Sequence, residues 1–123
     1  MKHVPLGARG SFSLLVQPEH LANRFKDAML PAVFATPVMI MVMENAALNA
    51  IKAYLDPGES AVGTEVNVRH LAATPVGRVV TGEAEVTKVD GLVRATEGEK
   101  EIGAGSHSRA VIDTAKFARR LAS

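Results

Sequence analysis

One apolar run, VFATPVMIMVMENAAL (residues 33–48), limits the possible folds of this chain more than any other segment, and it carries a single acid, Glu44. Threonine followed by proline is typical of a helix start, so Thr36 is the expected N-cap and Pro37 the first helical residue. The helix is expected to end near Leu55, because the sequence Asp-Pro-Gly that follows breaks helices. The residues within about 40° of Glu44 on a helical wheel are Ile40, Leu48, Ile51 and Leu55. Glu44 is therefore predicted to lie on the face that points toward the protein core.

After this breaker the hydrophobic period changes to strict alternation, which is typical of β-strands. The alternation predicts strands over residues 62–70 and 78–89, and it places His70 on the apolar face of the first. The other residues expected on the inner faces of these two strands are Val62, Thr64, Val66, Val68, Val80, Gly82, Ala84 and Val86. A short strand is also expected before the helix, over residues 11–16.

The last third of the chain predicts two more strands and a helix. Asp90-Gly91 is typical of a hairpin turn, and a strand over residues 92–96 follows it. This strand is much shorter than its expected neighbours. A turn is expected near Gly98, a final strand over residues 102–112, and a helix from residue 113 or 114 onward.

An antiparallel sheet that wraps around the helix buries both the apolar surface of the helix and the one apolar face of each strand. This arrangement is the α+β hot-dog fold, with its strands expected in a meander. A length of 123 residues favours a single domain over residues 1–123.

Composition excludes several classes of function. The chain has no cysteine, which excludes disulfides, thiol catalysis and thiolate metal sites. A net charge of +1 and an aromatic content of 4% do not fit nucleic-acid binding, which needs clustered cations and stacking rings. The apolar run is too polar to span a membrane and no signal peptide is evident, so a cytoplasmic location is expected. No HExxH, P-loop or GxSxG motif indicates a metal, nucleotide or serine-hydrolase site.

Three segments in this order, VFATPVMIMVMENAA, VGTEVNVRHLAATPVG and GSHSRAVID, resemble the fluoroacetyl-CoA thioesterase family of hot-dog proteins. The resemblance covers most of the chain. It implies a catalytic threonine, glutamate and histidine, which map onto Thr36, Glu44 and His70. It also implies a homodimer, or a tetramer, with the active site near the subunit interface. No separate cofactor is implied, because coenzyme A is part of the acyl-CoA substrate.

The resemblance implies substrate-binding positions as well. A glycine that lies close to the acyl group maps onto Gly63, and Phe34 of the FATP segment is assigned to the same set. The aromatic lid residue of the family falls at Leu30. Leucine departs from the family pattern there, which weakens the implication of a fluorinated acyl group but not that of a thioesterase acting on short acyl groups.

Thioester chemistry points to the same residues independently. Hydrolysis needs a group that attacks or activates water, a proton carrier, and donors that face the developing oxyanion. A carboxylate among apolar neighbours is a stronger base than in water, so Glu44 is expected to be the nucleophile or the general base. Histidine titrates near neutral pH, so His70 suits proton transfer to the CoA thiolate. Thr36 is expected to orient these groups, and the N–H groups that follow it to face an anionic oxygen.

Each assignment has a structural alternative. Glu44 alternatively forms an ion pair, His70 is a hydrogen-bonded core residue, and Gly63 only permits close packing. His107, which alternation places on the outward face of the last strand, is expected to be structural. The alternatives to a thioesterase are an acyl-CoA binding protein without turnover and a hot-dog hydratase, although the DxNxxH-like segment typical of such hydratases is missing.

Overall fold

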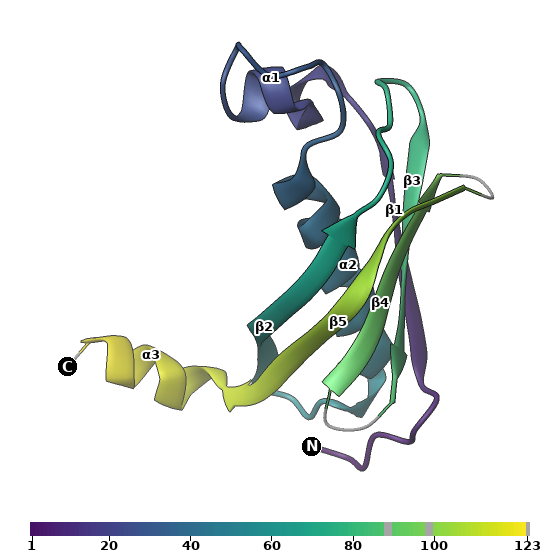
Figure 1. Cartoon of the computed structure of the whole chain (residues 1–123). Helices are drawn as coiled ribbons and strands as arrows, with labels where there is room; N and C mark the ends of the chain where they lie inside the picture. Colours follow the sequence, from purple (N-terminus) through teal and green to yellow (C-terminus); the bar gives the residue numbers. More distant parts are fainter. Residues whose placement is uncertain (88–89, 98–99, 123) are drawn as a thin grey trace.

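The computed structural model describes residues 1–87, 90–97 and 100–122. In it, an antiparallel sheet of five strands curves around one long helix (Figure 1). The strands are β1 (Arg9–Leu15), β2 (Glu59–His70), β3 (Val79–Val86), β4 (Asp90–Glu97) and β5 (Lys100–Asp113). The helices are α1 (Ala22–Phe25), α2 (Thr36–Ile51) and α3 (Thr114–Ala122), with short helical turns η1 (Pro18–His20) and η2 (Lys52–Tyr54). The predicted α+β hot-dog architecture is confirmed.

The strand order is β1-β3-β4-β5-β2, and every pairing is antiparallel. Only β3, β4 and β5 form the predicted meander. The strand that follows the helix, β2, pairs with β5 instead of with the next strand along the chain. Residues 71–78 carry the chain from the end of β2 across to β3. As a result, β1 and β2 are the two edge strands of the sheet.

Helix α2 lies on the concave face of the sheet and supplies much of the core. Its buried side chains are Val38, Met39, Val42, Met43, Ala46 and Ala50. The helix approaches the sheet so closely that a side chain at Gly10 of β1 would collide with the backbone of Ala46 and Ala50. A side chain at Gly82 of β3 would likewise collide with Val42. Glycine at these two positions therefore lets the helix pack directly on the strands.

The side of α2 that carries Glu44 is not the side that faces the sheet. The apolar residues on this side are only half-buried, and they are Ile40, Leu48, Ile51 and Leu55. The Glu44 side chain itself is 35% exposed. The sheet covers one side of the helix only, so the prediction that Glu44 points toward the core is wrong for the single chain.

Helix α2 starts one residue earlier than predicted. Its N-cap is Ala35, and no side chain caps it, so the prediction of Thr36 as the N-cap is wrong. Val38 N and Met39 N both donate to Ala35 O at 3.1 Å. Pro37 has no N–H, so within the described part of the chain only the Thr36 N–H of this first turn lacks an acceptor. The predicted group of several free N–H donors is therefore wrong.

A β-bulge in β5 changes which of its side chains point toward α2. Ile102 is an extra residue with no partner in β4, and such an insertion shifts the alternation by one residue. Gly103 then faces the helix, where a side chain would collide with Met39. Four residues further along, His107 faces the same way and is buried. The predicted outward orientation of His107 is therefore wrong.

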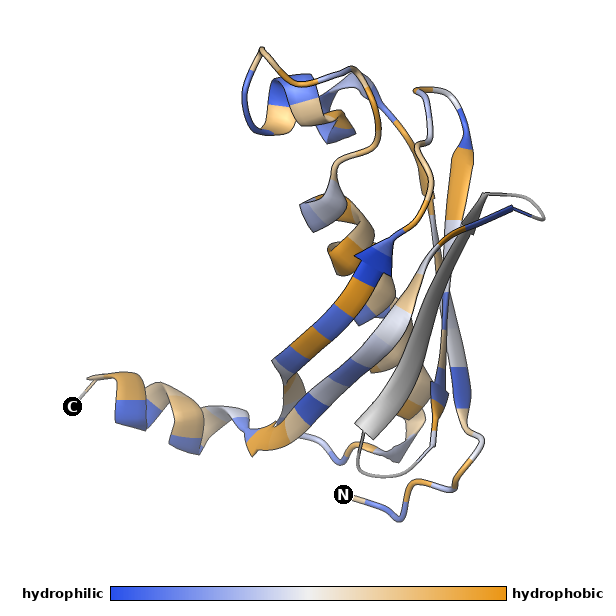
Figure 2. Cartoon of the chain, in the orientation of Figure 1, coloured by the Kyte–Doolittle hydropathy of each residue, from blue (hydrophilic) through white to orange (hydrophobic). Residues whose placement is uncertain are grey.

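A second irregularity lies in β2. The register with β5 shifts between Gly63 and Glu65, so Thr64 is the extra residue. Gly63 therefore faces α2, where alternation predicted Val62. Beyond this register shift, the face of β2 that was predicted to be the inner one does face α2, and His70 at the end of the strand reaches the start of the helix. The alternation of polar and apolar residues along β2 is visible in Figure 2.

The two hairpins beyond β2 are only partly as predicted. In β3 the alternation is regular, and Val80, Gly82 and Ala84 are buried as expected. The turn predicted at Asp90-Gly91 is wrong, because both residues belong to β4 and pair with β5. The turn predicted near Gly98 lies outside the described residues. Strand β4 has 8 residues, so it is longer than predicted and pairs with both neighbours.

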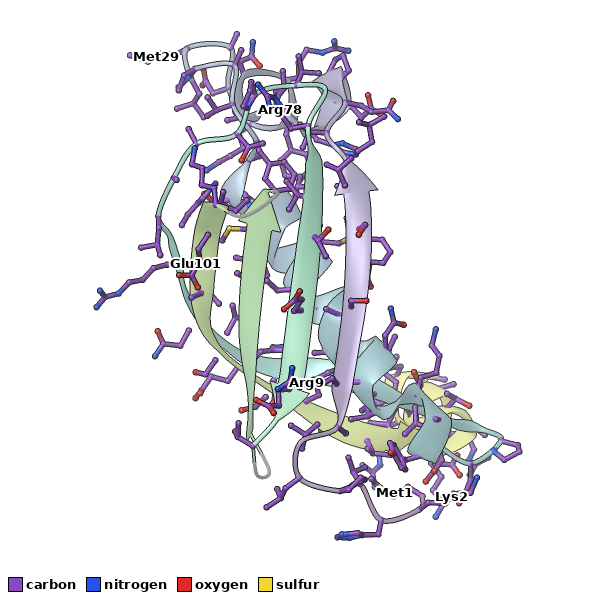
Figure 3. All side chains as sticks on the ribbon, turned by 90° about the vertical axis from the view of Figure 1, so that its right-hand side faces the viewer. Met1, Lys2, Arg9, Met29, Arg78 and Glu101 are labelled. Atoms are coloured by element: carbon purple, nitrogen blue, oxygen red, sulfur yellow. The ribbon has the colours of Figure 1, made fainter. Side chains whose placement is uncertain are left out.

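The outer face of the sheet is turned to the viewer in Figure 3. There Arg9 of β1 forms an ion pair with Glu85 of β3, with a closest N···O distance of 3.3 Å. Helix α3 begins where predicted, anchored by a bond of 2.9 Å from Thr114 Oγ1 to Gly58 O, and runs away from the sheet (Figure 1). None of the helices in the described segments is long and apolar enough to cross a membrane.

Candidate active site

The first half of the candidate site is a hydrogen bond between the start of α2 and the end of β2. Thr36 Oγ1 lies 2.8 Å from His70 Nδ1. The Thr36 hydroxyl is free to make this bond because Ala35 is the N-cap, and the helix backbone does not use the Thr36 side chain. His70 is the last residue of β2. The fold thus brings together two predicted site residues that are 34 positions apart in sequence.

The environment of His70 favours its neutral form. Burial lowers the pKa of the His70 imidazole, and a backbone interaction with Ala72 offsets part of this effect. The Nε2 atom is shielded from solvent and has no well-formed hydrogen bond to any described residue. When Nδ1 carries the hydrogen of the neutral ring and donates it to Thr36 Oγ1, Nε2 is able to accept a proton. This environment differs from that of the alternative interpretation, a fully hydrogen-bonded core histidine.

The second half of the site surrounds Glu44 in the middle of α2. Glu44 Oε2 packs against Gly63 of β2, where an added Cβ atom would lie 2.5 Å from this oxygen. The same Cβ would lie 3.0 Å from His107 Cε1. Non-bonded carbon and oxygen atoms do not approach each other to 2.5 Å, so the carboxylate keeps this position only because residue 63 is glycine.

Two side chains of β5 point at the same carboxylate oxygen. Glu44 Oε2 lies 3.9 Å from His107 Nε2 and 3.8 Å from Arg109 Nη1. His107 is 3% exposed, and its Nδ1 lies 2.8 Å from Glu65 O. Arg109 Nη1 lies 3.1 Å from His107 Nε2, and Arg109 Nη2 donates to Ala61 O. The carboxylate therefore faces a hydrogen-bonded pair of basic side chains.

The charges in this cluster are only partly shielded from water. The side chains of Glu44 and Arg109 are 35% and 14% exposed. Burial lowers the pKa of Arg109 and the charge of Glu44 raises it, but arginine stays protonated in proteins. The Glu44–Arg109 contact is longer than a hydrogen bond. The ion-pair interpretation of Glu44 is thus compatible with a carboxylate that remains accessible to a substrate.

Sequence reasoning did not assign His107 and Arg109 to the site. If inward and outward side chains are counted alternately from the buried Ile102, His107 and Arg109 point outward. Ile102 is an extra residue in β5, so the residues after it point the opposite way. The available signal was the pair of glycines at positions 103 and 105, because glycine inside a strand often marks a bulge or a close backbone approach.

The two halves of the site do not meet within one chain. Thr36 and Glu44 are eight residues apart on α2, which corresponds to about 12 Å along the helix axis. Gly63 and His70 are seven residues apart on β2, which corresponds to roughly 23 Å of strand. Thr36 therefore meets His70, and Glu44 meets Gly63, but Glu44 lies far from His70 of the same chain.

The remaining predicted site residues lie between α1 and α2. Phe34 is 1% exposed and belongs to the hydrophobic core, while Leu30 is half-buried. Contact of either residue with a substrate stays a prediction. Among residues 1–87, 90–97 and 100–122, no group of three or more His, Asp or Glu side chains is placed to hold a metal ion.

Comparison with known proteins identifies relatives of this chain. Residues 16–115 match the family model described as fluoroacetyl-CoA-specific thioesterase. The fluoroacetyl-CoA thioesterase of Streptantibioticus cattleyicolor is 47% identical over 122 residues, covering 91% of this chain and 88% of the relative.

Solved structures agree with this match. A structure of the fluoroacetyl-CoA thioesterase FlK superposes with a TM-score of 0.91 at 37% identity, covering 98% of this chain and 96% of that one. A Thermus thermophilus protein of the thioesterase superfamily gives a TM-score of 0.88 at 31% identity, covering 98% and 95%. The resemblance inferred from the three sequence segments is thereby confirmed. The chain belongs to the fluoroacetyl-CoA-specific thioesterase family, and its enzyme class is that of the acyl-CoA thioester hydrolases with a hot-dog fold.

Proposed function

We propose that this enzyme hydrolyses short-chain acyl-CoA thioesters to a free acid and CoA, with Glu44, His70 and Thr36 at the reacting centre. The observation that carries the proposal is the Thr36–His70 hydrogen bond of 2.8 Å, with the buried Nε2 of His70 lacking a well-formed hydrogen bond to any described residue. An oriented imidazole with an open nitrogen is what proton transfer to a leaving thiolate requires.

The reaction divides between the two halves of the site. Glu44 either attacks the thioester carbonyl carbon, giving an anhydride that water then hydrolyses, or removes a proton from the attacking water. His70 first takes up a proton from solvent water; the carbon–sulfur bond breaks, and the imidazolium delivers this proton to the sulfur of CoA and becomes neutral again. The proton that Glu44 removes from water, or that is released when water hydrolyses the anhydride, goes to the solvent. Thr36 holds the imidazole ring through Nδ1. The Thr36 N–H is the remaining donor in the first turn of α2, and it faces the developing oxyanion.

The site is complete only in a dimer. Strand β2 pairs with β5 on one side and is an edge strand on the other, and an open edge invites pairing with a second copy. Residues 63–67 of this strand are exposed. An antiparallel β2–β2 pair places Gly63 of one subunit opposite His70 of the partner subunit when the pair is centred between residues 66 and 67. Glu44, which lies against Gly63, then reaches His70 and Thr36 of the partner subunit.

The proposal that the acyl group is short rests on the ligands found in structures of related proteins. Structures of variants of the fluoroacetyl-CoA thioesterase FlK hold acetyl-CoA, or fluoroacetate together with CoA. Acetyl-CoA carries a small acyl group, and fluoroacetate is the free acid of another. In this chain Leu30 occupies the position of the aromatic lid residue of the family, so the proposal does not extend to preference for a fluorinated acyl group.

The test is CoA release from acetyl-, isobutyryl- and benzoyl-CoA by the wild type and by Glu44→Gln. The variant keeps the shape of the side chain but removes its negative charge and its basicity. We expect the turnover number to fall by at least about 100-fold, with the melting temperature unchanged. Near wild-type turnover in Glu44→Gln would overturn the assignment. Saturable binding of acyl-CoA to the wild type without thiol release would instead identify a non-catalytic binding protein.

A further inference from the structure

We propose that His107 is a positioning residue, whose neutral imidazole holds the Arg109 guanidinium against the Glu44 carboxylate. This inference rests on the proposed function, in which Glu44 reacts with the substrate or with water. His107 Nε2 lies 3.9 Å from Glu44 Oε2, which is beyond hydrogen-bond distance. His107 acts through Arg109.

The hydrogen bonds of His107 fix its tautomer. Glu65 O can only accept, so the hydrogen of the bond of 2.8 Å lies on Nδ1 of His107. Arg109 can only donate, so Nε2 of His107 accepts the bond of 3.1 Å from Nη1. Both requirements are met by the neutral ring with its hydrogen on Nδ1. A second proton on Nε2 would break the bond to Arg109 and place two cations in contact.

His107 is one of two anchors of the guanidinium group. Arg109 Nη1 donates to His107 Nε2, and Nη2 donates to Ala61 O across the strand pair. The Nε–H of Arg109 is buried and has no partner among the described residues. The contact with Glu44 Oε2, at 3.8 Å, is too long to hold the guanidinium by itself. Without His107 the guanidinium is held by a single hydrogen bond and is free to turn away.

The orientation of Arg109 matters because no other Lys or Arg among the described residues forms an ion pair with Glu44. Glu44 is the only ionisable residue within α2. From β5, only His107 and Arg109 bring a nitrogen within 4.0 Å of its carboxylate in the described part of the chain. Since His107 is neutral in this network, Arg109 supplies the positive charge beside the carboxylate. Positioning Arg109 therefore controls the electrostatic environment of Glu44.

Two conservative substitutions separate the roles of the two ring nitrogens. In His107→Gln the amide reaches the place of Nε2 and keeps an acceptor for Arg109. In His107→Asn the amide reaches only the place of Nδ1 and keeps a donor for Glu65 O. If His107 positions Arg109, Asn lowers kcat by about 10-fold with little change in KM, whereas Gln keeps kcat within about threefold of wild type. Loss of kcat in Gln but not in Asn would show that only the bond to the backbone matters.

A double-mutant cycle with Arg109→Gln tests whether His107 acts through Arg109. We expect His107→Asn to cost no further activity in the Arg109→Gln background, because the group that it positions is already gone. An equal loss of kcat in both backgrounds would overturn the proposal.

A measurement without substrate separates this inference from the proposed function. A guanidinium held at two points rotates slowly, so the Nη nitrogens of Arg109 should give distinct NMR signals in the wild type and in His107→Gln. The signals should average in His107→Asn. Distinct signals in His107→Asn would overturn the positioning role, whatever the activity of the enzyme. Absence of acyl-CoA turnover in the wild type would overturn the proposed function alone.

Discussion

The two halves of the candidate site lie on the same two elements, α2 and β2, but they are held in different ways. The Thr36–His70 half depends on one hydrogen bond between a helix terminus and a strand end, and one imidazole nitrogen stays free. In the Glu44 half, two basic side chains of β5 are bonded to backbone carbonyl groups of β2. One half is thus prepared to take up and release a proton, and the other fixes a charge.

This difference explains why neither half is a complete site. A proton carrier without a nucleophile or base beside it does not hydrolyse a thioester, and neither does a carboxylate without a group to protonate the leaving sulfur. The unlike halves lie seven residues apart along β2, at Gly63 and at His70, so a two-fold related copy that pairs along this edge brings them together.

The largest effect is expected when two inactive variants are mixed. Glu44→Gln and His70→Asn should each be inactive alone, because each lacks one half of every site. In a mixed dimer, one site receives His70 from the first variant and Glu44 from the second and is therefore intact. After unfolding and refolding of an equal mixture, we expect about a quarter of the wild-type CoA release, since half of the dimers are mixed and each has one intact site of two.

The matched control mixes two variants from the same half, Thr36→Val and His70→Asn. No site in that mixture regains both residues of the pair, so activity should not rise above that of Thr36→Val alone. Native mass spectrometry measures how much mixed dimer forms in each case. If Glu44→Gln and His70→Asn form mixed dimers without any recovery of activity, the halves do not combine across subunits.

The next effect concerns the hydroxyl group of Thr36. Thr36→Val keeps the shape of the side chain but removes the bond to His70, and kcat should fall by about 100-fold. Thr36→Ser keeps the hydroxyl and should retain most of the activity. Melting temperatures should change little, because Thr36 does not cap the helix. Equal turnover of the Val and Ser variants would show that the hydrogen bond has no part in catalysis.

The Thr36–His70 half could be predicted from the sequence better than the Glu44 half. Thr-Pro at a helix start and a histidine at the end of an alternating strand are local signals, and the regular part of β2 after its bulge kept the predicted face. The environment of Glu44 depends on two bulges, at Thr64 and Ile102, that no period count reveals. Each bulge reverses which side chains face the helix, which is why Gly63 and His107 took positions that alternation did not predict.

The fold was predictable for a similar reason. A helix that is apolar around most of its surface, followed by strands that are apolar on one face, leaves few arrangements that bury both. Strand order was not predictable in this way, because the pairing of β2 with β5 depends on contacts between residues distant in sequence. The helical-wheel prediction that Glu44 points toward the core was wrong for a related reason. A helical wheel reports which side of the helix is apolar, but not which side the sheet covers.

A smaller effect is expected from Gly63→Ala. The new methyl group would overlap with Glu44 Oε2, which can move because it ends a flexible side chain, whereas His107 Cε1 at 3.0 Å belongs to a buried ring. We expect the carboxylate to shift, kcat to fall by about 10-fold and the melting temperature to change little. A crystal structure of the variant should show Glu44 displaced and the Thr36–His70 bond intact. Unchanged kcat would indicate that the position of Oε2 against residue 63 is not the reactive one.

The smallest effect concerns stability and pH. Burial lowers the pKa of His70 from its ordinary value of 6.5, so the folded state binds a proton at this residue less readily than the unfolded state. The contribution of His70 to the free energy of unfolding is therefore constant above about pH 6.5. It falls as the pH drops from the pKa of the unfolded state to the lower pKa of the folded state. Below the pKa of the folded state it no longer changes.

This contribution can be isolated by comparison with His70→Gln, which lacks the titrating group while the other histidines remain. Between pH 7.5 and pH 5, the wild type should lose a few degrees of melting temperature more than the variant does. An identical decline in both proteins would mean that the imidazole is hydrated in the folded state. In that case the neutral, proton-accepting form of His70 would not be favoured by burial, and the distinction between a proton-carrying half and a charge-fixing half would lose its basis.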